Sequence, residues 1–138
     1  MRVSFTKAIL WVVALVIVAI VLVQPGAQRA KYVYDVQTLS NTCNFDEYDQ
    51  QDIRAVRDSI VIVMPIQTPT PCYDVEGTVS SFVSDIVVDL QTKKKGEVCV
   101  ECIGVVVAKV TISNLDKGTY GLQVNAPDKA IITTIKIE

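Results

Sequence analysis

The sequence predicts an all-β fold, an antiparallel sandwich of about seven strands behind one N-terminal transmembrane helix. Three observations support this prediction. Residues 8–23 form an apolar run without a charged side chain. From residue 59 onward, apolar and polar residues alternate with period 2 in short segments separated by Gly, Pro, Asn and Asp. No segment of helical period interrupts them, which argues against a parallel α/β sheet.

The N-terminal run is the predicted membrane anchor. Residues 8–25 are assigned to a transmembrane signal-anchor helix, preceded by a cytoplasmic n-region at residues 1–7, because backbone groups in lipid must satisfy their hydrogen bonds internally. Pro25 and Gly26 then end the helix. No small-x-small cleavage site follows, so an uncleaved anchor is favoured over a cleaved signal peptide and a secreted domain. The expected location is the cell membrane, single-pass, with the C-terminal domain outside the cytoplasm.

The chain behind the anchor divides into two predicted parts. Residues 26–58 are expected to be a linker followed by an acidic loop and a short helix around residues 47–57, and residues 59–138 are the extracytoplasmic sandwich. Residues 31–38 alternate moderately and are either a first strand of the sandwich or a stalk. A calcium site in the acidic part is disfavoured, because the EF-hand spacing of acids and Gly is missing.

The strands of the sandwich follow from the alternation. They are expected at residues 60–66, 73–79, 86–90, 98–102, 106–112, 120–124 and 131–137. Lys93, Lys94, Lys95 and Gly96 are interpreted as a turn, with a basic binding patch as the alternative.

Leu115, Gly118 and Tyr120 form an L-x-x-G-x-Y motif, which resembles the tyrosine corner of immunoglobulin-like and fibronectin-like sandwiches. The resemblance implies that the Tyr120 hydroxyl bonds back to the backbone at a connection between the two sheets, with Gly118 at the turn. Leu122 stands where antibody domains have a Cys, so the likeness concerns architecture. Residues 68–125 are similar to small extracytoplasmic domains of uncharacterised prokaryotic membrane proteins, which implies no activity.

Cys43, Cys72, Cys99 and Cys102 form an even set behind a secretion signal, which favours disulfides. Three pairings are possible. The alternation places Cys72 and Cys99 on one side of neighbouring strands, so we favour Cys72–Cys99 with Cys43–Cys102. The alternatives are a redox C-x-x-C at Cys99 and Cys102, which lacks nearby positive charge, and a four-cysteine zinc site, which needs a second C-x-x-C. Free cysteines are expected if the domain faces the cytoplasm.

The composition excludes several function classes. The sequence has no His, so Ser-His-Asp and Cys-His catalysis and imidazole-bound metals are excluded. A net charge of −2 argues against nucleic acid as a partner.

The function predicted is therefore that of a non-catalytic, membrane-anchored envelope protein whose domain is an interaction or structural module. It needs no cofactor, contacts lipid through residues 8–25 and has another envelope protein as its candidate partner, with residues 41–58 as the expected contact surface. The alternatives are an accessory subunit of a membrane complex and a thiol-disulfide oxidoreductase using Cys99 and Cys102.

Overall fold

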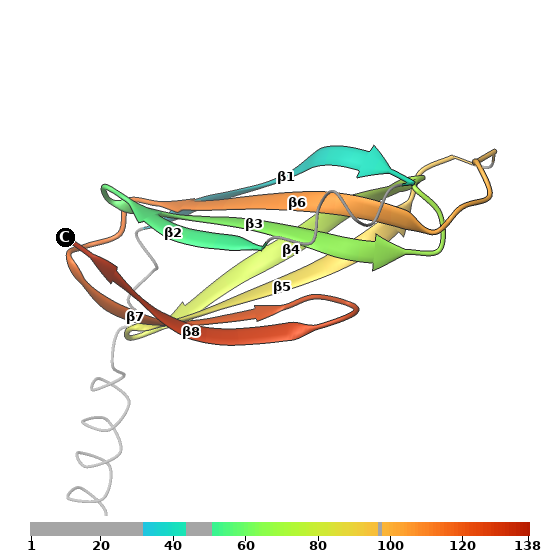
Figure 1. Cartoon of the computed structure of the whole chain (residues 1–138). Helices are drawn as coiled ribbons and strands as arrows, with labels where there is room; N and C mark the ends of the chain where they lie inside the picture. The colour runs from blue at the N-terminus through green and yellow to red at the C-terminus, as the bar shows by residue number, and fades with distance from the viewer. Residues whose placement is uncertain (1–31, 44–50, 97) are drawn as a thin grey trace, which may run out of the picture.

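Eight strands make up the computed structural model in Figure 1, which describes residues 32–43, 51–96 and 98–138. They are β1 (Val33–Thr42), β2 (Asp52–Val56), β3 (Ser59–Thr68), β4 (Tyr73–Phe82), β5 (Asp85–Lys94), β6 (Gly104–Ser113), β7 (Gly118–Asn125) and β8 (Ala130–Ile137). A search of these residues for a helix able to span a membrane finds none. The predicted anchor at residues 8–25 lies outside the described residues.

The strands form two four-stranded sheets that pack face to face (Figure 1), with the orders β1-β6-β3-β2 and β4-β5-β7-β8. Every pair is antiparallel except β5 with β7, which is parallel. The chain leaves β5, crosses to the other sheet as β6 and returns as β7, so the parallel neighbours need no helix between them. The all-β prediction is confirmed, with eight described strands in place of about seven.

The core lies between the sheets and is built mainly from β-branched and aliphatic side chains at alternate strand positions. β3 and β6 contribute the largest shares of it, and β5 and β7 face them from the other sheet. The largest fully buried side chains include Ile60, Ile62, Met64, Ile66, Ile86, Val88, Val110, Ile112 and Leu122. Pro65 is tolerated inside β3 because β2 pairs only as far as Val63, and no described strand pairs with that edge of β3 at the proline.

Residues 33–42 form a strand and not a stalk, and this strand fixes the two ends of the molecule. β1 pairs with β6 from Val33 opposite Ser113 to Thr42 opposite Val105. β1 also lies along β4 of the other sheet: the Tyr32 hydroxyl donates to the Val79 carbonyl at 3.0 Å, and the Asn41 amide donates to the Tyr73 carbonyl at 2.8 Å. The first described residue therefore lies near the end of β4, at the opposite end of the sandwich from Cys43.

Three local predictions are wrong. The helix expected around residues 47–57 is contradicted in its described part, because residues 52–56 are β2 and pair with β3. Both β1 and β2 thus belong to the sandwich and not to a linker or loop. Residues 98–102 are not a strand, since they pair with no strand in the part of the chain that the structure describes.

The third error concerns the lysine run. Lys93 and Lys94 extend β5, where they pair with Asp74 and Tyr73 of β4. The Lys93 ammonium lies 2.9 Å from a Glu76 carboxylate oxygen, and Lys95 lies 3.3 Å from Asp74.

Candidate functional site: the disulfide loop

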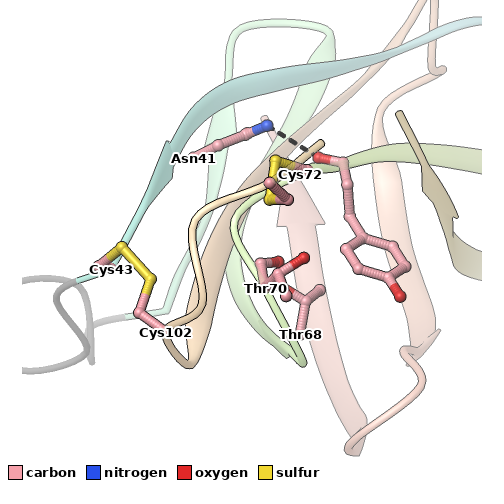
Figure 2. The surroundings of a disulfide bond; sticks show 8 residues. Asn41, Cys43, Thr68, Thr70, Cys72 and Cys102 are labelled. Atoms are coloured by element: carbon pink, nitrogen blue, oxygen red, sulfur yellow. Dashed lines mark hydrogen bonds between the residues drawn. A yellow bond between two sulfur atoms is a disulfide. The ribbon is translucent and has the colours of Figure 1, made fainter. Parts of the chain in front are cut away.

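Two disulfides close one end of the sandwich. Cys43–Cys102 has a Cα–Cα distance of 5.8 Å, and Cys72–Cys99 has one of 5.9 Å. Figure 2 shows how the first ties the end of β1 to the connection between β5 and β6, beside the segment that leads into β4. Both bonds hold residues 98–103, which we call the disulfide loop. This end of the molecule, the disulfide end, is at the right of Figure 1.

The strands place Cys72 beside the disulfide loop through a close backbone approach. Gly104 opens β6 opposite Thr68, and a Cβ at position 104 would overlap the Pro71 nitrogen and the Thr70 carbonyl carbon. Glycine is therefore required for residues 70–71 to cross here. The Thr68 hydroxyl donates to the Thr70 carbonyl at 2.7 Å and closes the turn. The Lys95 amide then donates to the Cys72 carbonyl at 2.8 Å.

The disulfide loop presents apolar side chains to solvent. Val98 is 94% exposed, Val100 is 66% exposed and Ile103 is 61% exposed. A tight turn, in which the Cys102 amide donates to the Val100 carbonyl at 3.1 Å, separates Val100 from Ile103. Soluble domains rarely gather exposed aliphatic side chains without a contact for them. Because disulfides fix Cys99 and Cys102, the backbone of the loop has less freedom to lose on binding than that of an unrestrained loop.

The disulfides join the pairs that the sequence favoured, but for a different reason. Neither Cys99 nor Cys102 belongs to a strand, so a shared face of neighbouring strands does not bring the partners together. The Gly104 crossing does this for Cys72, and the end of β1 does it for Cys43. Cys99 and Cys102 are each bonded to a distant cysteine and not to one another, whereas a redox C-x-x-C alternates between a dithiol and its own disulfide.

The four cysteines are all consumed by these bonds, so they do not form the four-thiolate zinc site considered from the sequence. A search of the described ranges found no group of three or more His, Cys, Asp or Glu placed to hold a metal ion.

The predicted corner residues lie at the other end. The Tyr120 hydroxyl donates to the Asp116 carbonyl at 2.8 Å. Leu115 is buried against the core and Gly118 begins β7. The bond lies on the connection from β6 in one sheet to β7 in the other, as the motif implies.

A shallow depression of about 620 Å³ lies on the outer side of the second sheet. Its lining includes Thr78, Asp89, Gln91 and Asn125, and the Asn125 amide donates to the Asp89 carboxylate at 2.7 Å. This bond occupies groups that a ligand would need, so we regard the depression as part of the ordinary polar surface.

No family model, no curated protein and no solved structure matched this chain. The fold and the site together define a disulfide-bonded β-sandwich domain, and its function is argued from its geometry.

Proposed function

We propose that this chain is a non-catalytic, membrane-anchored protein of the cell envelope. Its extracytoplasmic sandwich is immunoglobulin-like, and its disulfide loop binds an apolar patch on another envelope protein. The observation that carries the proposal is that two disulfides hold exposed Val98, Val100 and Ile103 at the end opposite to the start of β1.

The cysteines and the apolar run together support this location. Disulfides persist in oxidising compartments and are rare in the reducing cytoplasm. Residues 8–25 supply an apolar segment of a length suited to a bilayer. Because β1 starts near the end of β4 and runs ten residues toward Cys43, the disulfide loop lies about 30 Å farther along the sandwich than Tyr32. An anchor before Tyr32 would thus be attached to the end of the sandwich opposite to the loop.

The immunoglobulin-like assignment has support from the corner. The Tyr120 hydroxyl bond to the Asp116 carbonyl lies on a connection between two packed sheets, which is the place of the tyrosine corner in those folds. Loops at the ends of such sandwiches commonly carry the contacts with partners.

Location is tested by fractionation combined with thiol labelling. The intact chain is expected in the membrane fraction, extracted by detergent but not by alkaline carbonate. None of its four cysteines is expected to react with an alkylating reagent unless the protein is first reduced. Intact protein in the aqueous extract with all thiols reactive would contradict the proposal.

The contact surface is tested by placing a photo-crosslinking amino acid at Val98 in intact cells. We expect one adduct of discrete mass, with a protein that also accompanies the unmodified full chain in mild detergent. The matched control is the same substitution at Ile132, which is 80% exposed on β8 and is not part of the disulfide loop. Equal adducts from both positions would indicate non-specific encounters. A monomer in mild detergent with no adduct from Val98 would also count against an accessory-subunit role.

A further inference from the structure

The turn between β4 and β5 carries a second exposed apolar group. Phe82 pairs with Asp85 across a two-residue turn formed by Val83 and Ser84, and we call residues 82–85 the hairpin tip. Phe82 is 80% exposed and Val83 is 89% exposed. Their neighbours Ser81 and Ser84 are polar and also exposed, so the two apolar side chains project from a polar setting. Neither side chain packs in the core of the sandwich.

Val83 also has an unfavourable backbone conformation. Its φ is 57°, in the left-handed region, where β-branched side chains are rare and where Gly, Asn or Asp is the ordinary choice for a hairpin turn. The cost is roughly 1–2 kcal/mol. A residue that is both strained and almost fully exposed contributes little to folding, and such strain is typical of functional positions.

The position of the hairpin tip indicates what it contacts. Tyr32 donates a hydrogen bond to the Val79 carbonyl, and Val79 is three residues before Phe82 on the same strand. Eight residues lie between Val23, the last of the apolar run, and Tyr32, so this part of the chain spans at most about 30 Å. A bilayer that holds residues 8–25 is therefore tethered to the end of the sandwich that carries the hairpin tip.

We propose that the hairpin tip inserts Phe82 and Val83 into the interfacial layer of the bilayer that holds residues 8–25. This second lipid contact rests on the proposed function. The charged residues in the adjacent turns, Arg57 and Asp58 after β2 and Asp116 and Lys117 after β6, balance in sign, and the tip itself adds only the carboxylate of Asp85, so the surface around the tip is not cationic. The contact is thus hydrophobic and does not require anionic lipid, unlike polybasic membrane surfaces.

The test uses the full chain in phosphatidylcholine vesicles, with Trp11→Phe to remove the only natural indole. Phe82→Trp then reports on the hairpin tip and Val98→Trp, the matched control, on the disulfide loop. Lipids brominated in the upper acyl chain should quench the indole of Phe82→Trp and leave that of Val98→Trp unquenched. The emission of Phe82→Trp should also shift to shorter wavelength. Adding Val83→Asn, which suits the left-handed conformation, should reduce the quenching without unfolding the domain.

Each result has a distinct meaning. Quenching at position 82 alone, unchanged by high salt, supports the inference. If the protein floats with the vesicles but both indoles are quenched equally little, the inference is overturned while the anchor stands. If the protein does not float with the vesicles, the proposed function fails as well. A wavelength shift without quenching that grows with protein density means that the tip contacts a second copy, which also overturns the inference.

Discussion

The two ends of the sandwich both expose aliphatic or aromatic side chains, yet they hold them in different ways. At the disulfide end, Val98 and Val100 lie in a loop without strand pairing, and two covalent bonds restrain it. At the opposite end, Phe82 and Val83 extend a regular hairpin through an unfavourable backbone conformation. The disulfide loop therefore depends on its cross-links, whereas the hairpin tip depends on backbone pairing, between β4 and β5 and with β7, whose Gly121 amide donates to the Ser84 carbonyl at 3.0 Å.

The two ends also differ in which residues adopt backbone conformations with positive φ. The non-glycine residues with positive φ among those described are Arg57, Val83 and Asn114, and all lie in turns at the hairpin-tip end. At the disulfide end, glycine occupies the positions that other residues would not suit. Gly104 permits a close backbone crossing, and Gly96 has a φ of 81°. The disulfide end thus has residues suited to folding, and the hairpin-tip end retains a strained Val83.

Removing a disulfide has the largest expected effect. Cys43→Ala/Cys102→Ala and Cys72→Ala/Cys99→Ala should each lower the free energy of unfolding by roughly 3–4 kcal/mol, because the unfolded chain gains freedom. The two losses should be similar although the sequence separations are 59 and 27, since the shorter loop lies within the longer one. Urea denaturation of the full chain in detergent measures both. A loss no larger than that of a hairpin-tip variant would break the comparison between the ends.

Gly104→Ala should have the next largest effect on the free energy of unfolding. The added methyl group overlaps the backbone of residues 70–71, and relief requires that segment to move, at a cost of about 1–3 kcal/mol in unfolding free energy. Gly96→Ala is the matched control: its methyl group meets open space, so only the left-handed φ is penalised, at about 1 kcal/mol. Equal losses in urea denaturation would show that residues 70–71 do not cross as closely as described.

The strands of the core were predictable because buried and less buried side chains alternate along each strand, as apolar and polar residues do in the sequence. Ile60, Ile62 and Met64 alternate with less buried residues along β3, and only a sheet with one face on a core explains that pattern. The parallel pairing of β5 with β7 was not predictable, because it depends on which sheet each strand joins. The acidic stretch that becomes β2 was misread, since Arg57 and Asp58 give no Asn-Gly turn signal.

The candidate site was only half predictable. The cysteine pairs are those that the sequence favoured, although the strand at residues 98–102 on which that choice rested is absent. The exposure of Val98 and Val100 was not predictable, because an unpaired segment can alternate like a strand. Gly96 and Gly104, which bound that segment, were the signal that it is a connection. The hairpin tip was missed because Val83 replaces the residue types that usually mark such turns.

Val83→Asn tests the strain at the hairpin tip. The variant should unfold at the same or higher urea concentration, with a gain of up to about 1 kcal/mol, because Asn accepts the left-handed conformation. Val98→Ser, which removes a similarly exposed side chain at the disulfide end, should change stability by less than about 0.5 kcal/mol. Clear destabilisation by Val83→Asn would mean that Val83 packs against the domain and is not held out for a partner.

The smallest effect is expected from the exposed ion pair between Lys93 and Glu76, near the disulfide end. The hydrogen bond and charge of Glu76 raise the pKa of Lys93 above its ordinary value of 10.5. A raised pKa of a cationic group means that the pair stabilises the fold at neutral pH and that this contribution is lost as pH rises past 10.5. Because both side chains are solvated, Glu76→Gln should lower the Tm only slightly at neutral pH, and the difference from the unaltered chain should vanish in alkali.

Thermal melts from neutral to alkaline pH measure this difference in Tm. The control for a charge lost elsewhere is Glu138→Gln, which removes the acid of the exposed ion pair with Lys136. A drop at neutral pH comparable to the loss of a disulfide would mean that charge pairing holds the disulfide end together as strongly as the cross-links do.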